Sequence, residues 1–342
     1  MSTLKYILKR ILFVVPQLFG VVLVTFLAVR LIPGDPARIM AGALVDEAGV
    51  SLIRERMGLS GTLWEQFFAY VANLIRGDLG NSWVTGNPVL EDIKARLPAT
   101  LQLVVLALAV SLLVMVPLGI KSGSGSQGIL GRVRTHLLTG YGMAAGAFPD
   151  FWLALILIYV FYVVLGVAPP PTGQIDLSMS MPPSITGFSL IDAVLAGDWY
   201  AFASIAERLV LPVLVLAFVY GGGILKVAIT SAAAIRKSEF VNYAELNGVS
   251  PRIVDKMIAR ASYPAIATFS AVIFGYLVGG TVLVESVFSW GGFGQYAVQS
   301  VINSDFTAIQ GVVLVAAVLN PIPYMLVDIC YYYIDPRIKD LG

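Results

Sequence analysis

The sequence contains one cysteine, Cys330, and one histidine, His136. A disulfide framework needs a set of paired cysteines, so a disulfide-stabilised scaffold is excluded. Zinc, copper and iron–sulfur centres draw their usual nitrogen and sulfur ligands from cysteine and histidine, and this sequence cannot supply such a set. We therefore expect no metal site and no redox centre.

Charge is also scarce, because only 13% of the 342 residues are charged, whereas ordinary soluble proteins carry roughly 25%. Hydrophobic residues make up 58% of the chain and the mean hydropathy is +0.83, which excludes a water-soluble globule and a disordered chain. The formal net charge of +1 gives no basic field, so we expect no nucleic-acid partner. An integral membrane protein, with the lipid bilayer as its surroundings, remains.

Long apolar runs without charge predict transmembrane helices, because a hydrocarbon core of about 30 Å needs about 20 helical residues. The third run is interrupted by Asp150 and the sixth by Asp328. The sequence therefore predicts an all-α polytopic membrane protein with six transmembrane helices, and it shows no internal repeat. The six runs are residues 11–29, 99–120, 137–167, 209–225, 261–284 and 306–334.

The first apolar run follows Lys5, Lys9 and Arg10, which is also the pattern of a secretory signal peptide. Its uncharged core is longer than that of a signal peptide and no Ala-x-Ala site follows, so we interpret it as an uncleaved anchor. The predicted regions are a cytoplasmic N-terminus with the first transmembrane helix in residues 1–30, an extracytoplasmic loop region in 31–98, and a core of five transmembrane helices in 99–342.

Basic residues predict the orientation of the helices. With a cytoplasmic N-terminus, most Lys and Arg residues fall inside, and the outside loop between the fifth and sixth helices has none. Segment 31–98 contains basic residues, but loops of that length translocate largely regardless of charge. Both termini are therefore predicted to be cytoplasmic.

Two outside segments carry local patterns. Residues 63–71 place apolar side chains at helical spacing, which predicts an amphipathic helix that lies on the membrane or a partner, or packs as an ordinary loop helix. Residues 168–206 contain several prolines and glycines, so we expect an extended, irregular segment.

The inside segment 231–263 is more polar than the runs that flank it, yet its apolar residues keep helical spacing. Gly248 is predicted to divide it into two short helices. Such a segment is too polar to be buried in lipid and too apolar to be left wholly in water, which indicates a docking surface for a cytoplasmic partner.

No motif for catalysis was found. The run Gly221–Lys226 lacks the final Gly-Lys pair of a phosphate-binding loop, and its small residues favour close helix packing instead. The run Ser122–Ser126 reads as a flexible linker and not as a nucleophile elbow.

Charges at membrane depth cost about 2.5–3.5 kcal/mol each on insertion scales, so each needs a reason. They either line a solute path or proton relay, or they are helix-end residues that pair within the bundle. For Lys226, Glu285 and Asp328, which lie near predicted helix ends, the second interpretation is favoured. Asp150 follows Pro149 where a broken helix would expose backbone to a cavity. Asp150, Lys226 and Glu285 are the candidates for a translocation pathway.

Several short strings follow one another along nearly the whole chain. They are Ile32-Pro33-Gly34-Asp35-Pro36, Gly77-Asp78-Leu79-Gly80-Asn81-Ser82, Arg96-Leu97-Pro98-Ala99-Thr100-Leu101, Phe148-Pro149-Asp150-Phe151-Trp152, Glu285-Ser286-Val287-Phe288-Ser289-Trp290, Gly292-Phe293-Gly294 and Asp335-Pro336-Arg337-Ile338. In content and order, these strings resemble the dipeptide/oligopeptide/nickel permease family of ABC importers. The second outside loop, with Thr186-Gly187-Phe188-Ser189-Leu190-Ile191-Asp192-Ala193, looks most like the dipeptide branch of that family.

The resemblance implies a type I ABC importer permease fold in a bacterial or archaeal inner membrane. It implies a non-catalytic subunit that moves peptides or similar small solutes inward and forms half of the pathway with a second, usually different, permease. Two ATP-binding subunits, which use ATP and Mg²⁺, and an extracytoplasmic solute-binding protein would complete the transporter. This chain itself would bind no cofactor.

In this family, segment 231–263 is the loop that seats on the ATPase through an acidic-Ala-Ala-x-x-x-Gly motif. The resemblance therefore implies contacts from Glu239, Tyr243, Ala244, Glu245 and Gly248. The glycine and Ala244 match the motif. The departures are Leu246, Glu245 and Asn247 in place of the second alanine and the usual basic residues, and Gly291 in place of a proline.

Two other classes of membrane protein make different predictions for the sequence. An ion-coupled secondary transporter would work alone and would carry inverted repeats and a paired intramembrane ion site. A membrane enzyme would cluster Asp, Glu, His or Ser at membrane depth. The sequence shows neither the repeat nor the cluster, so the importer subunit is the favoured hypothesis and the secondary transporter is its alternative.

Overall fold

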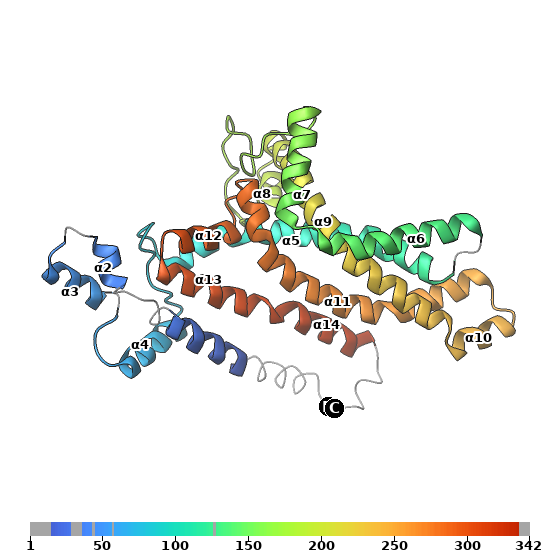
Figure 1. The fold of residues 1–342 in the computed structure, drawn as a ribbon, viewed down its shortest axis with the longest axis horizontal. Coiled ribbons are helices and arrows are strands. Elements are labelled where there is room, and N and C mark those ends of the chain that lie inside the picture. Colours follow the sequence, from blue (N-terminus) through green and yellow to red (C-terminus); the bar gives the residue numbers. More distant parts are fainter. Residues whose placement is uncertain (1–14, 29–35, 43–44, 57, 126–127, 335–342) are drawn as a thin grey trace. The chain divides into compact units, whose positions relative to one another are not determined.

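The computed structural model describes residues 15–28, 36–42, 45–56, 58–125 and 128–334 (Figure 1). Throughout these ranges the regular elements are helices, which confirms the predicted all-α class, and one isolated β-bridge joins Asn81 to Pro88. The chain forms two compact units. The first contains Leu97–Gln295 and the described residues from Asn320 onward, and the second contains the described residues up to Arg96 together with Tyr296–Leu319.

The first unit holds most of the long apolar helices. Its central helix, α9, packs against α11, α6, α7, α8 and α10 and buries Leu216, Ile224 and Leu225 completely. The elements are α5 (Val89–Gly123, beginning in the second unit), α6 (Ile129–Ala144), the 3₁₀ turn η1 (Ala145–Ala147), α7 (Asp150–Leu157), the π-helix η2 (Ile158–Val164), α8 (Ser189–Leu195), α9 (Trp199–Arg236), α10 (Glu239–Leu246), α11 (Pro251–Val287) and α14 (Pro321–Ile334).

Small residues bring α5 and α6 unusually close to α9. A Cβ added at Gly119 or Gly123 of α5 would overlap Ala228 or Ala232 of α9, and one at Gly222 would overlap Ala145. Backbones approach this closely only where side chains are absent, as in small-xxx-small helix pairs in membranes. The expectation that the glycines near Gly222 serve close helix packing is confirmed.

The third predicted span is broken. α6 with η1 and α7 with η2 meet at an angle of 105°, and Figure 1 shows α7 turning away from the line of α6. Phe148 and Pro149 both have extended backbones at the break. Proline lacks an N–H and disfavours the helical conformation in the residue before it, which accounts for the position of the bend.

The second unit contains shorter helices. Phe67 of α4 lies in edge-to-face contact with Phe19 and Phe26 of the helix Val15–Ala28. A capping box of Thr62 and Glu65 fixes the first turn of α4. The labelled elements are α2 (Pro36–Ala41), α3 (Glu47–Arg56), α4 (Leu63–Ile75), most of α12 (Phe293–Ile302) and α13 (Phe306–Leu319).

Five of the six predicted spans have counterparts. Helices α5, α9, α11 and the stretch Phe306–Val327 are long and apolar enough to cross a membrane, and the bent pair makes a fifth span. The helix Val15–Ala28 is shorter, and part of the first predicted span lies outside the described residues. The observed α9 and α11 begin about ten residues before the predicted runs. Charged residues within the first three turns of each helix interrupt the apolar pattern from which the runs were predicted.

Candidate functional site

The short helix α10 forms a compact hairpin with the start of α11. Gly248 divides the segment, as predicted, but the part after it is the beginning of the 37-residue helix α11 and not a second short helix. Gly248 has φ of +77°, a left-handed conformation that L side chains rarely adopt. The N–H of Val249 donates to the carbonyl of Ala244 at 3.1 Å, and the N–H of Gly248 donates to that of Glu245 at 3.0 Å. This pair of bonds is the Schellman arrangement, so Gly248 ends α10 and sets the direction of the chain into α11.

One side of α10 is anchored in the first unit. Val241 and Ala244 are buried, and Val241 forms a small apolar cluster with Ala232 of α9 and with Val254 and Ile258 of α11. The other side of α10 is open, and its large apolar side chains are highly exposed. These are Phe240 (46% exposed), Tyr243 (70%) and Leu246 (79%).

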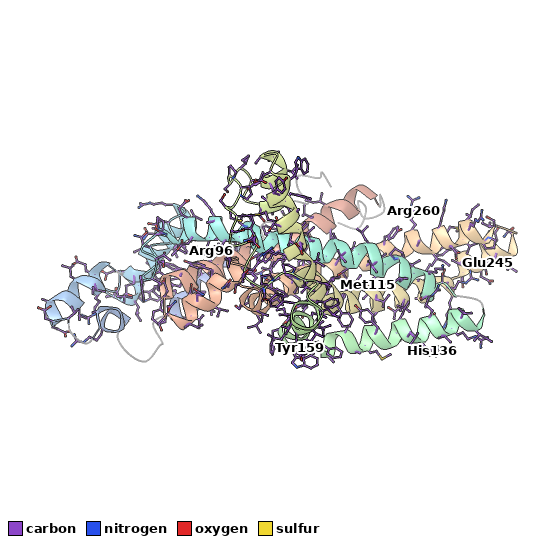
Figure 2. The ribbon with its side chains drawn as sticks, turned by 90° about the horizontal axis from the view of Figure 1, so that it is seen from above. Arg96, Met115, His136, Tyr159, Glu245 and Arg260 are labelled. Carbon is purple, nitrogen blue, oxygen red and sulfur yellow. The ribbon has the colours of Figure 1, made fainter. Side chains whose placement is uncertain are left out.

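Arg236 and Glu245 link the end of α9 to α10 through an ion pair of 2.5 Å. Figure 2 shows Glu245 near the end of the first unit, well away from Tyr159. The two side chains are 34% and 43% exposed, so the pair lies at the surface. The acidic residue that departs from the family motif thus has a basic partner.

The structure brings the five predicted coupling residues together on one hairpin. Glu239, Tyr243, Glu245 and Gly248 are exposed on it, whereas Ala244 packs inward. Their contacts with an ATPase remain a prediction. Sequence reasoning missed Arg236 as the partner of Glu245; its place one turn before α10 was the available signal.

Asp150 lies at the bend, as the first residue of α7, and borders a cavity of about 380 Å³. Its carboxylate Oδ1 accepts a hydrogen bond from the N–H of Phe151 at 2.7 Å, and Oδ2 accepts one from the hydroxyl of Tyr220 at 3.2 Å. Tyr220 was not predicted. A tyrosine inside an apolar helix needs a hydrogen-bond partner, and that need was the signal in the sequence.

Lys226 is exposed on α9 and is not among the residues that line this cavity. It lies six residues, about 9 Å of helix, beyond Tyr220. The structure therefore places two of the three pathway candidates on or near α9, but it does not bring Lys226 to Asp150. The side chain of Asp328 lies outside the described residues.

Glu285 is completely buried near the end of α11. Its carboxylate accepts hydrogen bonds from the hydroxyl of Thr100 at 2.5 Å and from the N–H of Gln295 at 2.8 Å. The Thr100 hydroxyl in turn accepts a bond from the N–H of Phe293 at 2.8 Å. Trp290, also buried, donates its indole N–H to the carbonyl of Ala99 at 3.2 Å. This network holds the turn after α11, which is the role expected of a helix-end residue that pairs within the bundle.

Two acidic residues shape the segment before α9. Burial disfavours the ionised form of Asp192, but hydrogen bonds from the hydroxyl and N–H of Thr186 and from the N–H of Gly187 outweigh it and lower its pKa. Hydrogen bonds from Ser178, and then the guanidinium of Arg208 at 2.8 Å, lower the pKa of Asp176. The segment is irregular up to the start of α8, as predicted, but it is firmly held and α8 was not predicted.

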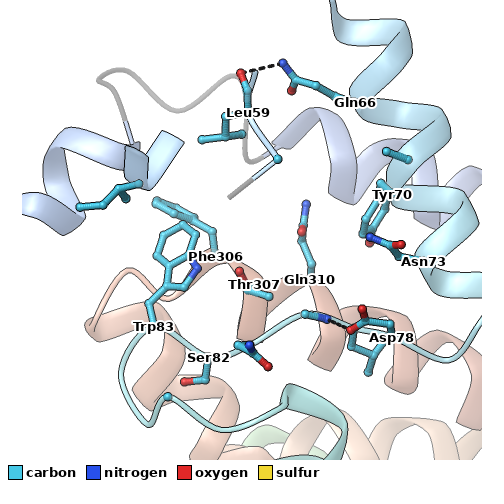
Figure 3. A pocket seen from close by; sticks show the side chains of 17 residues that line it. Leu59, Gln66, Tyr70, Asn73, Asp78, Ser82, Trp83, Phe306, Thr307 and Gln310 are labelled. Atoms are coloured by element: carbon cyan, nitrogen blue, oxygen red, sulfur yellow. Dashed lines mark hydrogen bonds between the residues drawn. The ribbon is translucent and has the colours of Figure 1, made fainter. Parts of the chain in front are cut away.

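A larger cavity, of about 690 Å³, lies in the second unit (Figure 3). Figure 3 shows the rings of Trp83 and Phe306 side by side on one wall, and their centroids are 5.5 Å apart. Two of the polar side chains on its walls have partners in the chain, because the amide of Gln66 donates to the carbonyl of Leu59 and that of Gln310 donates to the carbonyl of Thr25.

The string Gly77–Ser82 is explained by a buried carboxylate in the same unit. Asp305 accepts hydrogen bonds from the hydroxyl of Ser82 at 2.5 Å and from the N–H of Trp83 at 3.0 Å. A Cβ at Gly80 would overlap Thr307 of α13. Among the residues that the structure describes, no group of three or more His, Cys, Asp or Glu side chains is placed to hold a metal ion.

Comparison with known proteins gives concordant matches over almost the whole chain. Residues 115–340 match the family described as binding-protein-dependent transport system inner membrane component, and residues 3–104 match the N-terminal region described for the same systems. The probable D,D-dipeptide transport system permease protein DdpB of Escherichia coli (strain K12) is 38% identical over 322 residues, which is 93% of each chain.

Two further relatives cover even more of the chain. The di/tripeptide transport system permease protein DppB of Pseudomonas aeruginosa (strain UCBPP-PA14) is 34% identical over 98% of this chain and 99% of its own length. The glutathione transport system permease protein GsiC of Escherichia coli O6:H1 is 30% identical over the same shares.

Proposed function

Because the chain belongs to the family of binding-protein-dependent transport system inner membrane components, we propose that it is one of two permease subunits of an ATP-driven importer of dipeptides or similar small peptides. The names of the relatives support the peptide class, since they describe permeases for D,D-dipeptides, di- and tripeptides and glutathione. The multi-subunit systems to which these relatives belong support the presence of partner subunits.

The α10 hairpin is the observation that carries the proposal. An exposed apolar surface of Phe240, Tyr243 and Leu246 is unfavourable in water, and the buried side of α10 holds this surface in a fixed position on α9 and α11. A partner seated on α10 would therefore move these helices as it moves. We assign this surface to one of two ATP-binding subunits, which bind ATP and Mg²⁺ and perform all catalysis.

In the proposed orientation, α10 and both termini face the cytoplasm. Peptides arrive from an extracytoplasmic binding protein and enter between this chain and a second permease. Asp150, at the break in the third span, is the pathway residue that the geometry supports, because it borders a cavity. Glu285 is fully buried in a hydrogen-bond network of the fold and is not part of the proposed path.

Purification from the native host in mild detergent, followed by mass spectrometry, tests the proposal. A tagged chain is expected to bring with it two P-loop ATPases and a second permease of the same family. A matched preparation carrying Tyr243→Glu and Leu246→Glu is expected to retain the second permease and lose the ATPases, because the charges disrupt only the exposed face of α10.

Recovery of the wild-type chain alone, active in ion-driven uptake, would overturn the importer assignment in favour of a secondary transporter. The orientation is tested separately with a C-terminal tag in intact cells. The tag is expected to resist protease added outside, and its cleavage would show that the topology is reversed.

A further inference from the structure

The cavity at the bend has a distinct chemistry. Its walls combine one carboxylate, from Asp150, with the aromatic rings of Phe148, Tyr220 and Tyr276. Three segments of the first unit contribute, namely the bend itself, α9 and α11. Its volume of about 380 Å³ lies within the range of about 300–1,000 Å³ that is usual for small-molecule sites.

Asp150 has no cationic partner among the ion pairs of the described residues. Its two carboxylate oxygens have different surroundings. Oδ1 is used locally by the N–H of Phe151, which is the ordinary role of an acidic residue in the first turn of a helix. Oδ2 is directed to Tyr220 on another helix, and no local role of α7 requires this. A carboxylate within a membrane span is costly, and such residues commonly pair within the protein or mark a substrate pathway. The hydroxyl of Tyr220 is a neutral partner, so the charge of Asp150 remains to be balanced by a ligand.

The chain makes room for this arrangement. A Cβ at Gly280 of α11 would overlap the hydroxyl of Tyr220 and would lie 3.5 Å from Oδ2 of Asp150. Gly146 and Gly223 also line the cavity. Glycine at position 280 therefore allows the phenol to reach the carboxylate, and the cavity stays open beside the pair.

A carboxylate beside aromatic faces suits one class of ligand. Ammonium groups are attracted to carboxylates and to the faces of aromatic rings. A divalent metal ion would need several oxygen ligands, and the cavity lining provides only one carboxylate. An anionic ligand would be repelled by Asp150.

We propose that the cavity binds the N-terminal ammonium group of the peptide in transit, with Asp150 as its counter-ion and Tyr220 as the residue that positions the carboxylate. This inference rests on the proposed peptide import, and it specifies the N-terminal ammonium group as the part of the peptide that the permease recognises. The neighbouring rings of Phe148 and Tyr276 cover the apolar part of the ligand next to the ammonium group.

The test compares two solutes of similar size in the complete transporter, reconstituted in vesicles with its binding protein. Alanyl-alanine carries the ammonium group, and propionyl-alanine lacks it. The ratio of their initial uptake rates is measured for the wild type and for variants of this chain. The same binding protein is used throughout, so a change in the ratio reports on the permease.

Asp150→Asn is expected to lower this ratio about tenfold, the effect of losing one charge-assisted hydrogen bond. The variant keeps an oxygen for the N–H of Phe151, so the bend is preserved. Asp150→Glu is expected to retain most of the discrimination, and Tyr220→Phe to lose a smaller part of it than Asp150→Asn. Glu207→Gln, an exposed carboxylate on the same helix as Tyr220, is the matched control and is expected to leave the ratio unchanged.

An unchanged ratio in Asp150→Asn would overturn the ammonium site and leave the importer assignment intact. A wild-type transporter that takes up neither solute would overturn the proposed peptide import, and the site with it. Equal loss of uptake for both solutes in Asp150→Asn would show that Asp150 is structural and would also overturn the site.

Discussion

The hydroxyl of Thr100 on α5 lies 2.5 Å from the carboxylate of Glu285 on α11, and both groups are fully buried. The same hydroxyl accepts the N–H of Phe293, so one side chain joins two helices and the turn that follows the second. A Cβ at Gly292 would overlap both Thr100 and Glu285, which explains the glycine in the string Gly292-Phe293-Gly294.

Thr100→Val should therefore destabilise the first unit. The substitution keeps the shape of the side chain but removes one donor to the buried carboxylate of Glu285 and the acceptor of the N–H of Phe293, at a cost of about 1–3 kcal/mol. A lower midpoint of thermal unfolding, followed by size-exclusion chromatography of the detergent-solubilised complex, would show this. Thr230→Val is the control, because the Thr230 hydroxyl bonds only to carbonyls of its own helix and is exposed. Equal midpoints for the two variants would contradict the structural role of Thr100.

Replacement of Gly248 tests the end of α10. Valine cannot adopt φ of +77° without strain, so Gly248→Val should disturb the hairpin and lower the number of peptides imported per ATP hydrolysed. Gly248→Asn should have a much smaller effect, since asparagine tolerates the left-handed region. Both variants are expected to reach the membrane in normal amounts, as judged by immunoblotting. Normal coupling in the valine variant would remove α10 from the coupling role.

Exchange of the charges at positions 236 and 245 tests the ion pair. Glu245→Arg places two positive charges together, and Arg236→Glu places two negative charges together, so each single change should weaken attachment of α10. Their combination should restore most of the loss, although the pair itself contributes only about 0–1 kcal/mol because it lies at the surface. A double-mutant cycle on ATP-driven uptake measures the coupling between the two positions. A coupling energy of zero would mean that the two side chains act independently.

Acid should loosen the loop that Asp192 holds. The hydrogen bonds from Thr186 and Gly187 keep the folded-state pKa of Asp192 below its ordinary value of 3.8. Its ionised form therefore stabilises the fold fully at pH above about 4–5, and this contribution is lost as the pH falls through the lowered folded-state value. Asp192→Asn should lower stability at pH 7 by about 1–2 kcal/mol and should flatten the acid dependence of the unfolding midpoint. Parallel pH profiles for wild type and variant would refute this role.

Much of the fold could be predicted because membrane-spanning helices depend on a simple quantity, the length of an apolar run. The break at Pro149 and the division at Gly248 were also predicted, because proline and glycine act through local backbone geometry. The early start of α9 was not predicted. Its third turn carries Glu207 and Arg208, and the buried Arg208 pairs with Asp176, which is 32 positions away in the sequence.

The candidate site likewise has features that could be predicted from local sequence and features that could not. The exposed residues of α10 follow from helical spacing within one short segment. In contrast, the contacts of Asp150 with Tyr220 and of Glu285 with Thr100 join residues that are 70 and 185 positions apart. No local pattern encodes such pairs, so the sequence identified Asp150 and Glu285 alike as pathway candidates. The structure distinguishes them, because Asp150 borders a cavity and Glu285 is buried in a hydrogen-bond network.

The close packing of α5 on α9 indicates that the two helices move together as one rigid body. Only the methyl group of Ala232 stands between the backbones at Gly123, so little side-chain material is present to absorb a displacement, and we expect a movement of α10 to be passed along α9. Tyr220 lies twelve residues from Ala232 along α9, which is about 18 Å of helix, so a tilt of about 10° about the glycine contact shifts the phenol by about 3 Å. A movement of that size is enough to break and remake a hydrogen bond, and it would link the end of α9 next to α10 with the middle of α9, where Tyr220 lies.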